Sequence, residues 1–180
     1  MKMAHYFLAI PVNKEVRLIA RALQDELKAV DPFKIYVHPK DLHITIHFFG
    51  EMNEDDVLAL ANQIQVSINI HPFLLECGEI HYFGQKQQPR VVWLGVQQHP
   101  SLTKLYEMTQ KIIKENGFSI SNKKFVPHIT LAKKWKSNTS HFQLPTTPVP
   151  LTKLQVEKIV LYKIHPQSEP KYEAIYSIVL

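Results

Sequence analysis

The tripeptide His-Ile-Thr occurs twice in this chain, at residues 43–45 and 128–130, so the two copies are 85 residues apart. Shifting the sequence by this offset places Phe7-Leu8-Ala9 on Val92-Trp93-Leu94 and aligns the apolar positions of two helical segments. The repeated order is a strand, a helix, a connection and a strand that carries His-Ile-Thr. A repeat of this kind predicts two related lobes, and chance agreement in helical phase is the alternative.

Three segments have apolar residues at helical spacing, at residues 13–31, 53–68 and about 100–116. Eight short runs rich in β-forming residues lie around them, at residues 5–12, 34–37, 42–49, 73–83, 91–96, 128–133, 154–164 and 172–180. Residues 85–90 and the proline-bearing stretch 137–152 are predicted loops, and the last two strands are expected to form a hairpin. The alternation of strands and helices indicates a mixed α and β protein.

The length and composition narrow the class of protein. A chain of 180 residues fits one domain or two small lobes that share a core, and we expect a single bilobal domain over residues 1–180. The net charge of +5 suits a polyanionic partner. The one cysteine, Cys77, excludes an internal disulfide and four-thiolate zinc sites, and no run approaches the length of a membrane-spanning helix. We therefore expect a cytoplasmic protein with no membrane association.

The two tripeptides bring together groups suited to phosphoester chemistry. Residues two apart in a strand share a face, so His43 and Thr45 point one way, as do His128 and Thr130. In two lobes related by approximate two-fold symmetry, both pairs would face one groove. One imidazole could then remove a proton from an attacking oxygen while the other protonates a departing oxygen, and threonine hydroxyls could bind the non-bridging oxygens. Such a reaction requires no metal and no cofactor.

A structural interpretation of the motif has to be weighed against this chemistry. A single His-x-Thr means little in a chain with ten histidines, because a strand histidine is more often a surface or core residue. Two identical tripeptides, each at the corresponding place of a repeated pattern, favour the functional interpretation.

The chain also resembles a known family in a series of segments that spans nearly its whole length. These segments are residues 7–11, 41–51, 89–95 and 125–132, with the sequences FLAIP, DLHITIHFFGE, PRVVWLG and FVPHITLA. In order and spacing they are similar to the two-histidine (2H) phosphoesterases, and within them to the bacterial RNA 2′,3′-cyclic phosphodiesterases, also called 2′-5′ RNA ligases or LigT-like proteins.

The resemblance implies an α+β fold with two lobes, in which two antiparallel sheets face a central cleft and the helices lie outside. It implies metal-independent hydrolysis of the 2′,3′-cyclic phosphate ends of RNA or nucleotides to 2′-phosphomonoesters, with reversible 2′-5′ RNA ligation as a further activity. It also implies that His43 protonates the leaving 3′ oxygen and that His128 activates water. The symmetric sequence alone does not assign these two roles.

Two residues depart from the pattern of the family. Lys133 stands where relatives commonly have an arginine, so the charge is kept but the two-pronged contact with phosphate is lost. His47 stands where relatives usually have an apolar or small residue, and strand alternation puts it on the face of His43 and Thr45. We expect it at the floor or rim of the cleft, and a third catalytic imidazole is the alternative. We expect Thr45, Thr130 and Lys133 to bind the substrate phosphate. Further lysines near the second motif could contact RNA or be solvated, at positions 123, 124, 134 and 136.

Three other functions are compatible with the same residues. The cleft could serve a phosphodiesterase for small nucleotides, such as 2′-5′ oligoadenylates or cyclic ADP-ribose derivatives. It could hold RNA ends without turnover as a binding module. A metal site around His43 and His47 is the third alternative, and the absence of nearby acidic ligands argues against it. We expect a monomer.

Overall fold

Three helices occur where the sequence predicts them in a computed structural model that describes residues 3–136 and 142–180. They are α1 (Lys14–Val30), α2 (Glu54–Ser67) and α3 (Pro100–Glu115). The residues that cap their N-termini are Asn13, Asn53 and His99 respectively. The side chain of each accepts a hydrogen bond from a backbone N–H of the first turn. None of the helices in these residues is long and apolar enough to cross a membrane.

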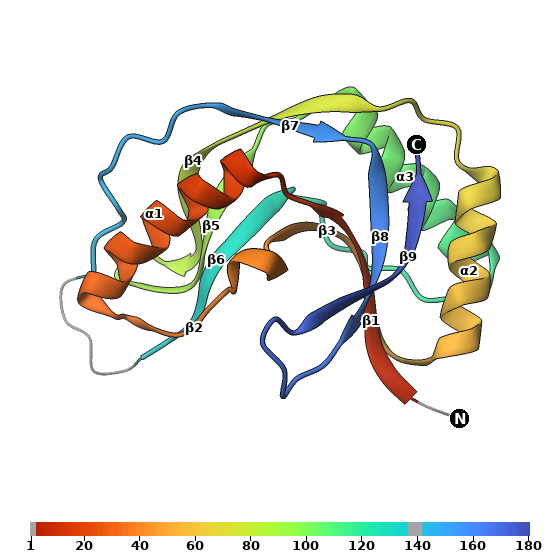
Figure 1. The fold of residues 1–180 in the computed structure, drawn as a ribbon, viewed down its shortest axis with the longest axis horizontal. Helices are drawn as coiled ribbons and strands as arrows, with labels where there is room; N and C mark the ends of the chain where they lie inside the picture. Colours follow the sequence, from red (N-terminus) through yellow and green to blue (C-terminus); the bar gives the residue numbers. More distant parts are fainter. Residues whose placement is uncertain (1–2, 137–141) are drawn as a thin grey trace.

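The strands form one antiparallel sheet, shown in Figure 1. Their order across it is β7-β4-β5-β6-β3-β1-β8-β9, and β2 pairs with β6 off this path. The bounds are β1 (Met3–Pro11), β2 (Phe33–Tyr36), β3 (His43–Asn53), β4 (Phe73–Gln85), β5 (Gln88–Val96), β6 (His128–Trp135), β7 (Thr152–Val156), β8 (Lys158–Ile164) and β9 (Tyr172–Val179). A 3-10 turn, η1 (Pro39–Asp41), precedes β3.

Two halves of the sheet meet at a single residue pair. Ile44 of β3 lies opposite Ile129 of β6, and both side chains are fully buried. These are the central residues of the two His-Ile-Thr tripeptides. The predicted α+β fold is confirmed, and its two antiparallel sheets are joined edge to edge into one curled sheet. Beyond this pair, β2 covers the same edge of β6 at Ala132, Lys133 and Trp135.

The two helices of the repeat, α1 and α3, cross over between the halves of the sheet. Each follows a strand of one half and packs against the other half. The chain leaves β1 and enters α1, which packs against β6 and β7 in the other half. It leaves β5 and enters α3, which lies beside α2 and reaches β3. Figure 1 shows α1 at one end of the molecule and the pair α2 and α3 at the other. The crossing ties the two halves together.

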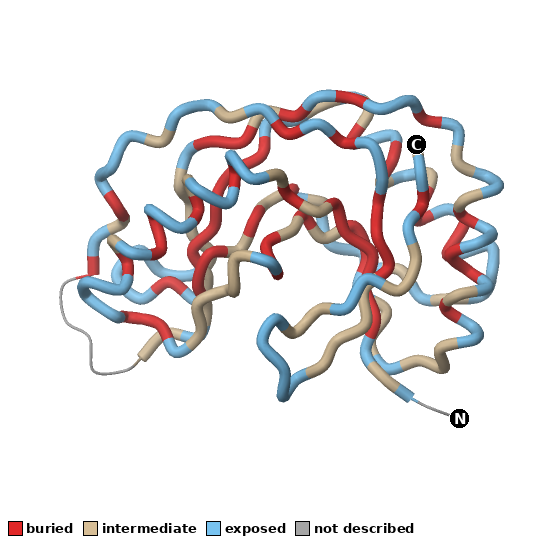
Figure 2. The backbone as a smooth tube through the Cα atoms, viewed as in Figure 1, coloured by how far each residue is buried: buried red, intermediate tan, exposed pale blue. Residues whose placement is uncertain are grey.

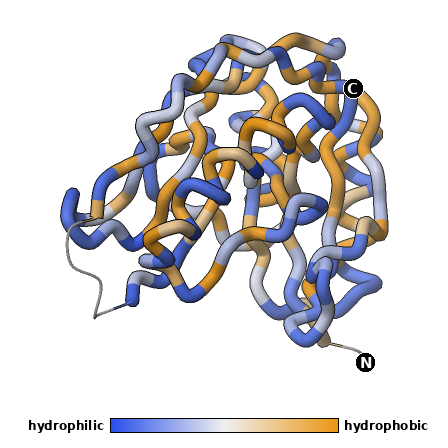
Figure 3. Tube along the Cα trace, turned by 60° about the vertical axis from the view of Figure 1, so that its left-hand side comes forward, coloured by the Kyte–Doolittle hydropathy of each residue, from blue (hydrophilic) through white to orange (hydrophobic). Residues whose placement is uncertain are grey.

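The core lies between the helices and the sheet. The buried face of α1 consists of Val16, Ala20, Leu23 and Leu27, the apolar series of the sequence, with one glutamine among them. Buried positions alternate with exposed ones along the outer helices in Figure 2, and the apolar strands run through the interior in Figure 3. Burial of these faces supplies most of the stabilisation, since isolated helices of this length are marginal in water.

The strand pairing corrects the ungapped alignment of the repeat by one residue. Pro11 lies opposite His43 and Gly95 lies opposite His128, so β1 and β5 correspond with an offset of 84 and not 85. Aligning Leu8 with Trp93 was therefore wrong. A shift of one residue exchanges the two faces of a strand, and Leu8 belongs to the core whereas Trp93 contacts His128.

Two loop and strand predictions are also wrong in detail. Residues 85–90 are not a loop, because β4 and β5 continue into a tight turn at Lys86 and Gln87. Residues 154–164 are two strands, of which β7 pairs with β4 and β8 pairs with β1. In the predicted loop 137–152, residues 137–141 lie outside the described residues. The predicted hairpin of the last two strands is confirmed as β8 and β9.

We expect Ile129→Ala to destabilise the fold and to disturb both histidines. Removing this buried side chain should cost about 2–5 kcal/mol of the free energy of unfolding, measured by urea denaturation. Ile159→Ala in β8 removes an equally buried side chain away from the junction and serves as the control. Imidazole NMR signals of His43 and His128 should shift in Ile129→Ala only. Equal shifts in both variants would mean that the junction does not position the pair.

Candidate active site

The two histidines are held in the same way in the two halves. The ring of His43 contacts the backbone carbonyl of Asp41 through Nδ1 at 2.7 Å, and His128 contacts the carbonyl of Val126 through Nδ1 at 2.7 Å. A carbonyl oxygen only accepts, so the proton of each neutral ring lies on Nδ1. Nε2 of each ring is therefore the nitrogen available for proton transfer. Nε2 of His43 lies 2.9 Å from Oγ1 of Thr45.

Aromatic side chains surround both imidazoles. Around His43 the ring centroids of Phe7 and Tyr172 are at 4.8 and 5.4 Å, and around His128 those of Phe83 and Trp93 are at 5.1 and 5.5 Å. Burial disfavours the charged form of histidine. It lowers the pKa of His43 to about 4, and it also lowers the pKa of His128.

A β-bulge turns Lys133 toward the histidines. In β6, Thr130 lies opposite Trp93 and Ala132 lies opposite Val92, so Leu131 is an extra residue. Lys133, opposite Val91, therefore shares the face of Thr130, which simple alternation would not give. The structure places Lys133 half-buried on the cleft face, where desolvation and the neighbouring Lys134 and Lys171 lower its pKa.

A second bulge turns His47 to the other face of β3, towards Gln110 of α3, where it still lines the cavity that Thr45 and His128 also line. In β3, Thr45 lies opposite Ala9 and His47 lies opposite the core residue Leu8, with Ile46 as the extra residue. The prediction that His47 shares the face of His43 and Thr45 was therefore wrong. The ring of His47 is buried, and its Nδ1 lies 3.1 Å from Oε1 of Gln110.

Both bulges are braced by a buried glutamine of the helix that crosses from the other half. Gln24 of α1 donates to the carbonyl of Leu131 at 2.8 Å, and Gln110 of α3 donates to the carbonyl of Ile46 at 3.4 Å. A bulged residue leaves its backbone groups outside the regular ladder, and the amide side chains satisfy one of them. The sequence contains both glutamines at helical positions, but only the bulges explain them.

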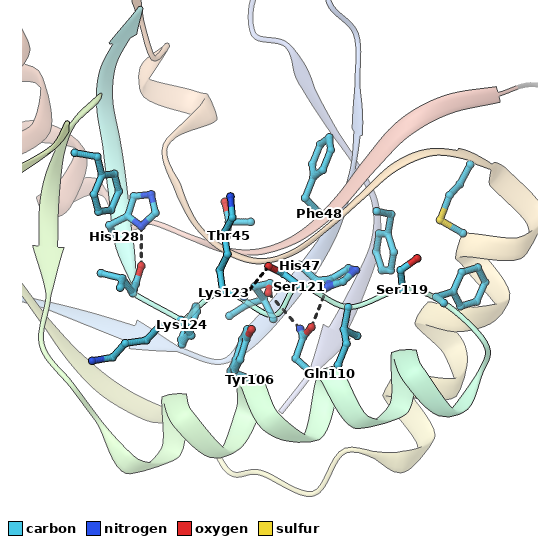
Figure 4. Close-up of a pocket in the computed structure, with 18 residues that line it drawn as sticks. Thr45, His47, Phe48, Tyr106, Gln110, Ser119, Ser121, Lys123, Lys124 and His128 are labelled. Carbon is cyan, nitrogen blue, oxygen red and sulfur yellow. Dashed lines mark hydrogen bonds between the residues drawn. The ribbon is translucent and has the colours of Figure 1, made fainter. Parts of the chain in front are cut away.

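Two cavities lie at the site: His128 lines one, and the other is lined by Asp41 and Tyr172, both of which contact His43. The larger, about 930 Å³, is lined by Thr45 and His128 and continues along aromatic and apolar side chains, shown in Figure 4. The smaller, about 360 Å³, contains Lys34, Lys133 and Lys171. Lysines near the second motif do not form one cluster: positions 123 and 124 line the larger cavity, and Lys136 pairs with Asp31. In the described residues no group of three or more His, Cys, Asp or Glu side chains is arranged to hold a metal ion.

Asp41 is a site residue that sequence reasoning missed. Its side chain is 4% exposed, and its carboxylate accepts hydrogen bonds from the backbone N–H groups of Lys171 and Tyr172 at 2.8 and 3.3 Å. The hairpin of β8 and β9 is thereby fixed beside His43, with Tyr172 against the imidazole. An acidic residue two positions before the motif histidine was the available signal, but its partners lie 130 and 131 residues away in the chain.

A duplicated α+β fold with two His-x-Thr strands facing one cleft defines the class of two-histidine phosphoesterases. The sequence model described as "LigT like Phosphoesterase" matches residues 10–93. An RNA 2′,3′-cyclic phosphodiesterase of Bacillus subtilis is 30% identical over 98% of this chain and 96% of its own. One from Geobacillus stearothermophilus is 32% identical over the whole chain, which spans 58% of that relative's length.

Solved structures show the same architecture. Escherichia coli LigT complexed with 3′-AMP has a TM-score of 0.77 at 23% identity, covering 99% of both chains. The protein TT0787 of Thermus thermophilus also has a TM-score of 0.77, at 25% identity, covering 98% of this chain and 97% of its own. This chain belongs to the LigT-like phosphoesterase family.

We expect Asp41→Asn to loosen the C-terminal hairpin. The substitution keeps the size of the side chain but removes its charge and one of its two acceptor oxygens. The free energy of unfolding should fall by about 1–3 kcal/mol, and the amides of Lys171 and Tyr172 should exchange faster with deuterium. Asp25→Asn, at an exposed surface ion pair, is the control and should change stability by less than about 1 kcal/mol. Unchanged exchange at both amides would exclude the proposed anchoring.

Proposed function

We propose that this protein hydrolyses 2′,3′-cyclic phosphate ends of RNA to 2′-phosphomonoesters. The observation that carries the proposal is the pair of imidazoles at one cleft, each with its proton fixed on Nδ1 and Nε2 left for proton transfer. The relatives from Bacillus subtilis and Thermotoga maritima, both named RNA 2′,3′-cyclic phosphodiesterases, support the substrate. Hydrolysis in this scheme uses no metal and no cofactor.

In the proposed step, a water oxygen attacks the phosphorus while the bond from phosphorus to O3′ breaks. Nε2 of His128 takes the proton of the water, and Nε2 of protonated His43 gives a proton to O3′. The products are a 2′-phosphate and a free 3′ hydroxyl. Proton exchange with solvent then restores the starting forms of both rings. In-line displacement requires the two rings on opposite sides of the phosphorus, and the proposal takes one ring from each half of the sheet.

We assign the binding of the phosphate to Thr45, Thr130 and Lys133. The two hydroxyls lie on the faces of the motif histidines and can donate to non-bridging oxygens, whose charge grows in the transition state. Lys133 and Lys171, in the smaller cavity, add positive charge. In the free protein Nε2 of neutral His43 accepts a hydrogen bond from the hydroxyl of Thr45. In the proposed complex this hydroxyl donates to the phosphate instead, and Nε2 of protonated His43 donates to O3′.

We also propose that one chain acts alone, as a single bilobal domain in the cytoplasm. Both histidines and both threonines come from the same chain and meet through its own sheet. A second copy is not needed to complete the site.

The function is tested by incubating the protein with RNA oligomers and nucleotides that end in 2′,3′-cyclic phosphate and separating 2′ from 3′ phosphate products. Both His43→Ala and His128→Ala should lower kcat by about 10² to 10⁴, and the double variant should lose less than the product of the two. The exposed His71→Ala is the control. Binding of RNA ends without turnover would favour the binding module, and exclusive turnover of 2′-5′ oligoadenylates would favour the small-nucleotide enzyme.

A second test uses pH. In the active free enzyme one of the two Nε2 atoms must carry a proton and the other must not. Burial lowers the pKa of both rings from 6.5, that of His43 to about 4. The singly protonated pair becomes scarce as pH rises above this range. We therefore expect a bell-shaped profile of kcat/KM with its maximum below about pH 6.5. The maximum of kcat should lie at higher pH, because the bound phosphate anion stabilises an imidazolium. A kcat/KM that rises up to pH 9 would exclude an imidazolium acid.

A further inference from the structure

His47 is the histidine that the proposed reaction does not use. Its ring lies at the floor of the larger cavity, between β3 and α3, and is 7% exposed. Figure 4 shows it hydrogen-bonded to Gln110, which also lines this cavity. It also contacts the edge of Phe49, with the ring centroids 4.6 Å apart.

The hydrogen bonds of Gln110 fix which nitrogen of His47 carries the proton. Nε2 of Gln110 donates to the carbonyl of Ile46, so its amide oxygen faces His47. An amide oxygen only accepts, and Nδ1 of His47 is therefore the donor. Burial lowers the pKa of the ring, which keeps it neutral at pH 7. Nε2 of His47 is left as a hydrogen-bond acceptor that has no partner among the described residues. This atom is not completely buried, so a ligand can reach it.

The fold itself does not require this imidazole. In the second half of the repeat the corresponding position, two residues after the motif threonine, is Ala132. The bulge beside it is braced by Gln24 without any help from a histidine. Burying an imidazole costs desolvation free energy, and only one half of the repeat has this cost. Because the ring also lines a cavity, we infer that its role lies in that cavity.

The walls of the larger cavity suit a planar ligand. Besides His47 it is lined by aromatic and aliphatic side chains, namely Phe48, Phe49, Met52, Phe83, Tyr106, Phe118, Ile120 and Phe125. Phe48, at its rim near Thr45, is 57% exposed, which is unusual for so large an apolar ring. Exposed rings of this kind stack on unpaired bases. Thr45 and His128 line the same cavity, so a base attached to the reacting ribose would reach it.

We propose that His47 selects the base of the terminal nucleoside, its Nε2 accepting a hydrogen bond from an exocyclic amino group. This inference rests on the proposed function, because it takes the ligand to be a nucleotide whose phosphate lies between His43 and His128. Adenine, cytosine and guanine carry such a group, and a base without one leaves the acceptor unpaired.

The test compares two substrates that differ only in the amino group, the 2′,3′-cyclic phosphates of adenosine and of purine riboside. The wild-type protein should favour adenosine in kcat/KM by about threefold to tenfold, mainly through KM. In His47→Phe, which keeps a ring of similar size, the ratio should fall to about one, with turnover of the purine riboside substrate retained. The exposed His71→Phe is the matched control and should keep the wild-type ratio.

A second variant reverses the polarity of the same ring. In Gln110→Glu the carboxylate would accept from Nδ1 and favour the imidazolium, so Nε2 would become a donor, while the hydrogen bond to the carbonyl of Ile46 would be lost. We expect the adenosine preference to be lost and the 2′,3′-cyclic phosphate of inosine, which has an acceptor oxygen in place of the amino group, to be favoured. Thermal unfolding checks that each variant is folded. If His47→Phe does not fold, an unchanged adenosine preference in Gln110→Glu overturns the inference.

The outcomes separate this inference from the proposed function. Should the wild-type protein turn over none of these substrates, the same ratios are measured as Kd by calorimetry, with adenosine 2′-monophosphate and purine riboside 2′-monophosphate as probes. An adenine preference that His47→Phe removes supports the role of His47 even without turnover. Equal values for the two bases in the wild-type protein, or a preference that survives in His47→Phe, overturn it.

Discussion

The contact of Ile44 with Ile129 is the constraint on which the rest of the molecule depends. It is the single residue pair through which β3 and β6 join the two halves of the sheet in the described chain, and both side chains are fully buried. Because alternate residues of a strand face opposite ways, burying these two isoleucines on one side necessarily presents four polar groups on the other. The pairing of Ile44 with Ile129, the central residues of the two tripeptides, thus brings the histidines and threonines to one cleft.

The bulges determine what else reaches that cleft. Without the extra residue in β6, Ala132 would occupy the face of Thr130, and Lys133 would point away. Each bulge is braced by a glutamine from the helix that crosses over from the other half. The crossing helices that stabilise the duplicated fold therefore also set the direction of the side chains that follow each motif. The packing of the helices thus determines which residues line the site.

This dependence explains what the sequence could and could not predict. Helical periodicity predicted all three helices of the described residues, and the repeated tripeptide singled out His43 and His128 as candidates, because each signal is contained in a short segment of the chain. The register of β1 against β3, the face of His47 and the role of Asp41 depend on pairings between distant segments. A bulge has no local signature in HITIHFF or HITLAKK, since each reads equally well as an uninterrupted strand. Strand alternation therefore succeeded up to each threonine and failed two or three residues later.

The two histidines are equivalent by duplication, yet the proposed reaction needs one as an acid and the other as a base, and we attribute the difference to the parts of the chain outside the repeat. The hairpin of β8 and β9, fixed by the carboxylate of Asp41, encloses His43 with Tyr172. His128 instead borders the larger cavity, where a nucleoside and a water molecule can approach. A more enclosed imidazole suits proton donation to an oxygen that never leaves the substrate, whereas the base has to meet a water molecule that enters from solvent. The segments added to a symmetric scaffold thus provide the asymmetry that the proposed reaction requires.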